Sequence, residues 1–260
     1  MTTPVWTRYV AIGDSFTEGM SDPDPVTTGA YVGWADRLAV HLDAVAEEAH
    51  VPFAYANLAV RGRKLDDVVG PQLDSALSLS PDLVSLVGGG NEDAVVRLRR
   101  AGADVLLATP ADPRDAGLFK ALRPRHAVHS ANIFTIAQRH ECHVLNLWGI
   151  AALRDWRMWG EDRIHLSSEG HRRVALAALT ALGHGTDVAE WATPLAPATR
   201  GARRDEFREH AQWARTHAAP WVQRRLRGES SGDRLAAKRP TLTPLRDPDL
   251  EPAHGSQPEG

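Results

Sequence analysis

The chain has 260 residues, of which 43% are hydrophobic and 24% charged, and its formal net charge at pH 7 is -3. This composition is that of an ordinary globular protein with a sizeable core, and the small negative charge argues against a general attraction to nucleic acid or anionic membranes. The single cysteine, Cys142, excludes an internal disulfide.

The N-terminal sequence MTTPVWTRYV lacks the basic segment and following apolar stretch of a secretory signal. No window approaches the roughly 18 uninterrupted apolar residues that a membrane helix requires. We therefore expect a cytoplasmic protein with no membrane span and no nucleic-acid partner. The sequence leaves the oligomeric state open.

Short apolar runs alternate with longer amphipathic runs between residues 8 and 183. The apolar runs are mostly continuous, which is typical of parallel strands covered on both faces. They span residues 9–12, 53–60, 82–87, 103–109 and 143–148. Helical patterns with apolar residues three or four apart span residues 33–49, 64–79, 93–101, 121–140 and 168–182. The alternation predicts an α/β fold with a five-stranded parallel sheet, whose ligands bind at the carboxyl ends of the strands.

Beyond residue 183 the composition changes, and Pro, Gly and Arg become abundant. We expect a globular domain over residues 1–183 and a C-terminal extension over residues 184–260. The extension is predicted to contain one helix at about residues 200–217, then a basic stretch and a disordered end.

A serine follows the first predicted strand, in the sequence GDSFTEGM. The hydroxyl of Ser15 is a poor nucleophile unless a neighbouring base takes its proton and a third group orients that base. The segment EDRIHLSSEGHRR offers both groups, because Asp162 and His165 lie three residues apart just before a helix that Ser167 or Ser168 would cap. We therefore expect these side chains to share one cleft.

Acyl transfer also needs hydrogen-bond donors for the oxyanion. The segment NLAVRGRK ends a strand and places Gly62, whose backbone can approach a ligand closely, at the same edge of the sheet. The segment SLVGGGNED similarly places the amide of Asn91 there. Four separate segments thus bring complementary groups to one edge.

These segments resemble the four sequence blocks of the SGNH hydrolase family, also called the GDSL esterases and lipases. The blocks are GDSFTEG, NLAVRG, GGNE and DRIH. The resemblance implies that Ser15 is the nucleophile, His165 the general base and acid, and Asp162 its orienting carboxylate. It also implies an oxyanion hole made by the backbone amides of Ser15 and Gly62 and the side chain of Asn91.

The resemblance spans roughly residues 8–183 and implies an SGNH hydrolase-like catalytic domain, a three-layer α/β/α sandwich of flavodoxin-like topology. It implies a serine ester hydrolase that acts on a small or acylated substrate through an acyl-enzyme, without cofactor or metal. Family members act on acetylated sugars, lipids, thioesters and small esters, so the family does not define the ester.

Two departures from the family pattern support an alternative function. Glu92 follows Asn91, where the family usually has Asp, and only residues 92–102 separate Asn91 from the next strand. A crossover of about ten to twelve residues is near the minimum for parallel strands, and it omits a loop that often lines the pocket in the family. The alternative is a catalytically impaired protein of this fold that binds an acylated or glycosylated ligand.

Other patterns in the sequence favour structural roles. The segment GESSG around Ser230 fits the Gly-x-Ser-x-Gly pattern but lacks the strand and helix that this motif requires on either side. Two histidine pairs, within residues 126–129 and 140–143, have no Cys or acidic partner at matching spacing, so we expect no metal site. Three tryptophans near the Asp-His segment are assigned to the core or, as the second choice, to an acyl pocket: Trp148, Trp156 and Trp159.

Overall fold

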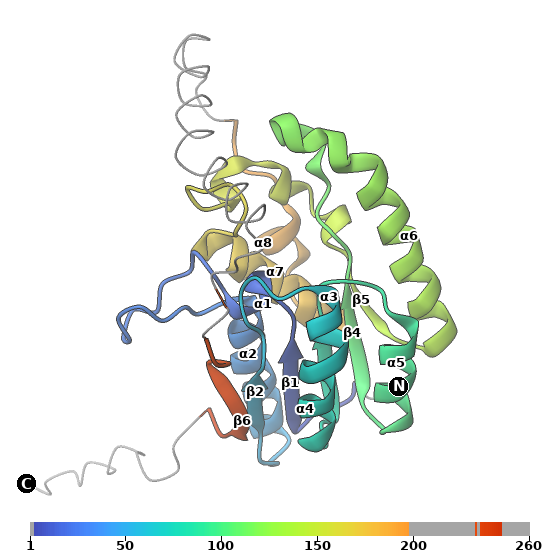
Figure 1. Ribbon diagram of the computed structural model, residues 1–260. Helices are drawn as coiled ribbons and strands as arrows, with labels where there is room; N and C mark the ends of the chain where they lie inside the picture. The colour runs from blue at the N-terminus through green and yellow to red at the C-terminus, as the bar shows by residue number, and fades with distance from the viewer. Residues whose placement is uncertain (1–2, 198–231, 233–234, 246–260) are drawn as a thin grey trace, which may run out of the picture.

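The structure is a computed structural model that describes residues 3–197, 232 and 235–245 (Figure 1). Its centre is a six-stranded sheet with the strand order β5-β4-β3-β1-β2-β6. The strands are β1 (Arg8–Ile12), β2 (Ala54–Asn57), β3 (Leu83–Leu86), β4 (Asp104–Ala108), β5 (His143–Leu145) and β6 (Arg239–Thr243). The first five are parallel, and their order 2-1-3-4-5 confirms the flavodoxin-like topology.

Helices cover both faces of the sheet, as Figure 1 shows. On one face lie α2 (Trp34–Glu48), α7 (Ser168–Ala181) and α8 (Val188–Ala192), and on the other α4 (Leu73–Ser78), α5 (Glu92–Arg100) and α6 (Arg123–His140). Alternate residues of β1 enter the two hydrophobic clusters: Tyr9 and Ala11 pack on the α2 and α7 side, Val10 and Ile12 on the α4 and α5 side. Burial on both faces explains why the strand sequences are continuously apolar.

The predicted helix over residues 64–79 is interrupted in the structure. It consists of α3 (Leu65–Asp67), a π-helical turn at Val68–Gln72, and α4. Pro71 lies inside the π-helical turn. Proline has no N–H and clashes with the preceding turn of an α-helix, so the wider turn accommodates it.

Short 3-10 turns fill two of the connections at the carboxyl edge of the sheet. Between β4 and α6 they span Pro113–Asp115 and Gly117–Leu122. Between β5 and α7 they span Leu147–Gly149, Ala151–Arg154 and Trp156–Met158. The short crossover after Asn91 forms as well, since the nine residues of α5 connect β3 to β4.

The C-terminal extension requires a correction. Its end was expected to be disordered, yet Arg239–Thr243 forms β6, which pairs antiparallel with β2 through Tyr55 opposite Thr243 and Asn57 opposite Arg239. A strand that joins an existing sheet depends on tertiary contacts more than on its own composition, so the Pro-rich surroundings misled the prediction. The helix at about residues 200–217, the basic stretch and Ser230 lie outside the described residues, and the domain boundary at residue 183 stays a prediction.

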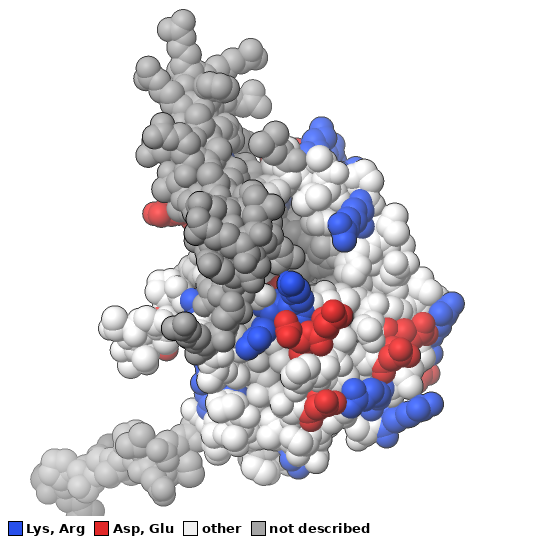
Figure 2. Space-filling view, in the orientation of Figure 1, with Lys and Arg blue, Asp and Glu red and all other residues white. Residues whose placement is uncertain are grey.

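Acidic and basic side chains are interspersed on the face seen in Figure 2, in keeping with the small net charge. Over the part of the chain that the structure describes, no helix combines the length and apolar character needed to cross a bilayer.

Candidate active site

Ser15 lies at the carboxyl end of the central strand β1. It is the first residue of the short helix α1 (Ser15–Glu18), and the Asp14 carboxylate accepts a hydrogen bond from the amide of Phe16 at 3.0 Å. The buried side-chain amide of Gln72 accepts from the N–H of Gly13 at 2.9 Å and donates to its carbonyl at 3.0 Å. The turn that presents the serine is thus held at both of its preceding residues, Gly13 by Gln72 and Asp14 by its own hydrogen bond to the amide of Phe16.

Ser15, His165 and Asp162 form a hydrogen-bonded chain. The distance between His165 Nε2 and Ser15 Oγ is 2.9 Å, and that between His165 Nδ1 and Asp162 Oδ2 is 2.6 Å. Because an ionised carboxylate can only accept, Nδ1 carries the proton towards Asp162, and Nε2 is left to accept from the serine hydroxyl. Groups that are 150 residues apart in sequence therefore meet as predicted.

Asp162 also builds the turn that carries the histidine. Its Oδ1 accepts from the amides of Ile164 and His165, both at 3.0 Å. Arg163, which follows Asp162 directly, has a left-handed φ of 55°. Burial works to raise the pKa of Asp162, but the hydrogen bonds from the His165 ring and from these two amides outweigh it and lower the pKa to about 2. The carboxylate is therefore ionised at any pH at which an imidazole can act as a base.

The backbone on either side of His165 is fixed by neighbouring elements. The amide of Gly160 donates to the His165 carbonyl at 2.7 Å, and Trp159 and Leu166 form an antiparallel bridge. Ser167 then caps α7 by accepting from the amide of Gly170 at 3.3 Å. The imidazole thus projects from a short segment that is anchored on both sides.

The two other predicted oxyanion donors lie in the connections that follow β2 and β3. Gly62 is an exposed residue with a φ of 75°, a left-handed conformation that favours glycine. Asn91 is the N-cap of α5, and its Oδ1 accepts from the amide of Ala94 at 2.8 Å. This use of the oxygen leaves the NH₂ group of the same side chain for another acceptor.

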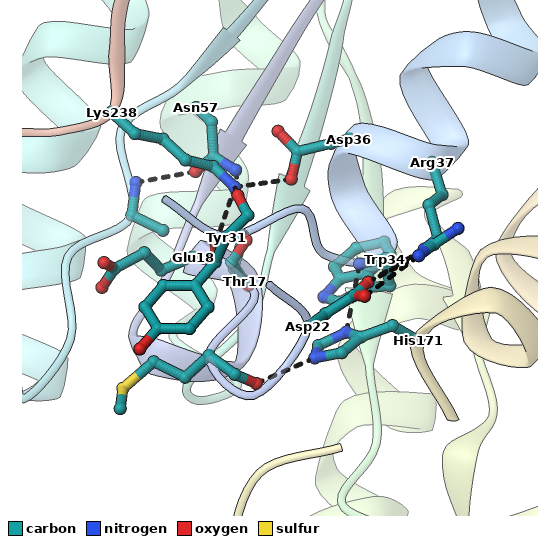
Figure 3. Close-up of polar contacts among 12 residues, drawn as sticks. Thr17, Glu18, Asp22, Tyr31, Trp34, Asp36, Arg37, Asn57, His171 and Lys238 are labelled. Carbon is teal, nitrogen blue, oxygen red and sulfur yellow. Dashed lines mark hydrogen bonds and ion pairs between the residues drawn. The ribbon is translucent and has the colours of Figure 1, made fainter. Parts of the chain in front are cut away.

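Several buried polar residues brace residues 13–36, which form the serine side of the site. Figure 3 shows how these side chains lie. The fully buried His171 accepts from the amide of Trp34 through Nδ1 at 3.1 Å, and its Nε2 lies 3.2 Å from the carbonyl of Met20. Burial, the largest influence, lowers the pKa of His171 to about 4, so the ring is neutral and its Nε2–H donates to Met20. Asp22, which is 1% exposed, accepts two hydrogen bonds from the guanidinium of Arg37, both at 3.0 Å.

These bracing residues, together with Gln72 and Glu18, were not predicted from the sequence. Glu18 could have been noticed in the sequence, because it is a carboxylate within the serine block GDSFTEG. In the folded chain it is only 8% exposed. The Glu18 carboxylate accepts from the amide of Arg61 at 2.6 Å and from its Nε at 2.9 Å. Gln72 and His171 gave no comparable signal, because their partners are backbone groups that only the folded chain brings near.

An apolar cavity of about 240 Å³ lies beside residues 147–166, which form the histidine side of the site. Arg163 and Ile164, which separate Asp162 from His165 in the chain, belong to its wall. The rest of the wall comes from the 3-10 turns after β4 and β5 and from the start of α6, with these large side chains: Phe119, Leu122, Leu153, Arg154, Trp156 and Trp159. Two of the three tryptophans named from the sequence thus line a cavity next to the histidine turn.

A buried carboxylate with two arginine partners supports one wall of this cavity. Asp112, 5% exposed, accepts from Nε of Arg123 at 2.7 Å and lies 3.3 Å from the guanidinium of Arg154. The remaining tryptophan, Trp148, is outside the cavity wall and lies under the guanidinium of Arg123 at 5.3 Å. Through these two ion pairs, Asp112 joins the start of α6 to the 3-10 turn that carries Arg154.

Within the described residues, no group of three or more His, Cys, Asp or Glu side chains is arranged to hold a metal ion. Cys142 is half-buried against the hydrophobic cluster beneath α5 and α6, and burial raises the pKa of its thiol to about 11. It is therefore a packed, protonated thiol at neutral pH.

A parallel sheet covered on both faces, with a hydrogen-bonded Ser-His-Asp chain at its carboxyl edge, is an arrangement typical of serine hydrolases. Residues 11–173 match the GDSL-like Lipase/Acylhydrolase family, and the chain belongs to this family. No match was found among curated proteins.

Solved structures share the fold. An α/β hydrolase enzyme, LAE5, from the metagenome of Lake Arreo in Spain is 22% identical, with a TM-score of 0.53, over 68% of this chain and 95% of its own. The acetylxylan esterase Axe2 of Geobacillus stearothermophilus is 17% identical, with a TM-score of 0.56, over 71% of this chain and 98% of its own. A structure of TesA is 18% identical, with a TM-score of 0.51, over 67% and 97%.

Proposed function

We propose that the protein is a carboxylic ester hydrolase that uses Ser15 as its nucleophile. The observation that carries this proposal is the hydrogen-bonded chain from Ser15 Oγ through His165 to Asp162, with distances of 2.9 and 2.6 Å. Membership of the GDSL-like family supports it. For the acetylxylan esterase Axe2, replacement of a serine or of a histidine gives proteins described as catalytic mutants, which also supports a serine and histidine pair here.

In the proposed reaction, Ser15 Oγ attacks the ester carbonyl carbon while His165 Nε2 takes the hydroxyl proton. The carbonyl π electrons move to oxygen, and the resulting oxyanion accepts hydrogen bonds from the amides of Ser15 and Gly62 and from the NH₂ group of Asn91. The carbonyl re-forms as the alcohol leaves with the proton from His165, which produces an acyl-enzyme. Water then attacks this ester in the same way, so that the carboxylic acid leaves and Ser15 recovers its proton.

Asp162 stays ionised throughout and stabilises the imidazolium that forms in each half of the reaction. Its pKa of about 2 suits this role, because the carboxylate does not take the proton itself. The apolar cavity beside Arg163 and Ile164 is the proposed site for an apolar part of the substrate, which agrees with an ester of a small aliphatic acid.

A fluorophosphonate probe tests the proposal, because it reacts with an activated serine. We expect covalent labelling at Ser15 and hydrolysis of p-nitrophenyl acetate, and we expect Ser15→Ala to lose both. Ser75→Ala on α4 is the matched control, since the Ser75 hydroxyl donates to the carbonyl of Pro71 at 2.9 Å, one turn earlier in the chain. Folded protein that is neither labelled nor active would refute the hydrolase and favour the ligand-binding alternative.

A further inference from the structure

The strand β6 comes from a part of the chain beyond the family match, which ends at residue 173. The pairing of Arg239 with Asn57 places the start of β6 opposite the end of β2. Since β1 and β2 are parallel neighbours, the residue before β6 lies at the same sheet edge as Ser15. That residue is Lys238.

The ammonium group of Lys238 reaches into the serine side of the site, as Figure 3 shows. It donates to the carbonyl of Glu18 at 2.6 Å, to the carbonyl of Tyr31 at 2.9 Å, and to the carboxylate of Asp36 at 2.6 Å. An ammonium has three donors, so all of them are used. The side chain is 24% exposed, which limits the competition from water.

The acceptors of Lys238 are tied to both proposed oxyanion amides. Glu18 is the last residue of α1, whose first residue is Ser15. The Glu18 carboxylate in turn holds the amide and guanidinium of Arg61, the residue before Gly62. A continuous series of polar contacts therefore runs from Lys238 to the two segments that must present their amides to one oxygen atom.

The charges in this cluster are balanced. Lys238 pairs with Asp36, and Arg61 pairs with Glu18. Because Lys238 approaches Glu18 through its backbone carbonyl, the Glu18 carboxylate is left to Arg61. The two cations thus hold the C-terminal end of α1 and the residue before Gly62 without competing for one anion.

A second point of the C-terminal segment contacts the same turn. A Cβ on Gly232 would lie 1.9 Å from the carbonyl oxygen of Arg61, so only glycine allows the two backbones to approach so closely. Residues 232 and 238 therefore both contact the pair formed by Glu18 and Arg61.

We propose that Lys238 is a positioning residue for the ester hydrolysis proposed above, which keeps α1 and the Gly62 turn aligned so that their amides bind one oxyanion. The C-terminal segment is then part of the active site of this chain. Because an oxyanion hole stabilises the transition state more than the bound ester, its misalignment lowers kcat and leaves KM nearly unchanged.

Lys238→Met in the full chain tests this role, because methionine keeps the apolar stem and removes the ammonium. We expect kcat for p-nitrophenyl acetate to fall by about tenfold or more, below the hundred- to thousandfold typical of losing a whole oxyanion donor. KM should change by less than about twofold, as for any interaction confined to the transition state. Arg97→Met is the control, because it removes one positive charge on α5, from an exposed ion pair with Asp74 of α4. This control should leave both constants unchanged.

A rescue separates the ammonium from general packing. Lys238→Cys, alkylated with 2-bromoethylamine, regains a side chain with a terminal ammonium at nearly the native length, and we expect kcat to recover. The native protein treated in the same way controls for reaction at Cys142. A lowered melting temperature with unchanged kcat, or a loss that appears only in KM, would overturn the positioning role.

Hydrogen exchange keeps this test separate from that of the proposed function. In Lys238→Met we expect faster exchange in residues 15–20 and 58–63, and unchanged exchange in the strands β3 and β4. This result would support the positioning role of Lys238 even if the native protein hydrolysed no ester. The absence of ester hydrolysis would count only against the proposed hydrolase function. Unchanged exchange in both residues 15–20 and residues 58–63 would overturn the positioning role of Lys238.

Discussion

The two sides of the candidate active site are built differently. The serine side, residues 13–36, is held by buried or half-buried polar pairs. Asp22 pairs with Arg37 nearby in the chain, whereas Glu18 and Asp36 pair with the distant Arg61 and Lys238. The histidine side, residues 147–166, contains three 3-10 turns, and its Trp156 and Trp159 form part of the wall of an apolar cavity. Polar pairs are directional and fix atoms, whereas apolar contacts tolerate changes of shape.

This difference matches the separate demands of the proposed chemistry. An oxyanion is the same for every ester, so the amides that bind it can be held rigidly. The acyl and alcohol groups differ from one ester to another, so the surface that receives them is the one expected to vary. We infer that selectivity depends on the histidine side and rate on the serine side.

The largest effect is expected where the two sides meet. His165→Ala removes the only base in contact with Ser15 Oγ among the described residues, and Asp162→Asn removes the acceptor that orients it. Each should lower kcat by about ten-thousandfold. Initial rates with p-nitrophenyl acetate measure this, with Asp74→Asn as an exposed carboxylate-to-amide control. Activity within tenfold of native in either variant would contradict the proposed mechanism.

Asn91 tests the oxyanion donors on the serine side. Asn91→Ala should lower kcat by about a hundred- to a thousandfold, since it removes a donor to the oxyanion. It should also cost about 1 kcal/mol of stability, because Asn91 caps α5. Asn91→Ser keeps a capping oxygen and lacks the amide donor, so we expect native stability with lowered kcat. If Asn91→Ala lowered the stability and left kcat at the native value, Asn91 would be a helix cap and not an oxyanion donor.

The parallel strands, their order and the residues that contact Ser15 were predictable from the sequence. Continuous apolar runs and the spacing of Asp162 and His165 are local signals. The resemblance to the SGNH hydrolase family then implied the strand order and the meeting of these residues with Ser15. The bracing residues were not predictable, since His171 and Gln72 bind backbone groups whose positions only the fold defines. Strand β6 was missed for a related reason, because its partner β2 lies about 180 residues earlier.

Acid should weaken the serine side through His171. Its folded-state pKa of about 4 lies below the ordinary 6.5, so the native ring favours the neutral form and the unfolded chain binds the extra proton. Stability is therefore complete above about pH 6.5 and falls as the pH decreases towards 4, by about 2 kcal/mol at pH 5. Urea unfolding at pH 7 and pH 5 measures this, and His171→Gln should reduce the difference. An NMR titration that gives His171 an ordinary pKa would contradict the prediction.

The smallest expected effect concerns the cavity on the histidine side. Trp156→Ala enlarges the cavity, so the ratio of kcat/KM for p-nitrophenyl octanoate to that for the acetate should rise by about fivefold. Trp148→Ala is the matched control, since Trp148 lies outside the cavity wall. An equal change of this ratio in both variants would show that the cavity does not determine the preference for acyl chain length.

The pairing of β6 with β2 also bears on self-association. Without β6, the outer edge of β2 would present unpaired N–H and C=O groups, which can recruit a strand from another molecule. The strand that occupies this edge carries Pro240, an exposed residue with no N–H, which discourages further strand addition. A chain cut before residue 235 should therefore form aggregates that the 260-residue chain does not.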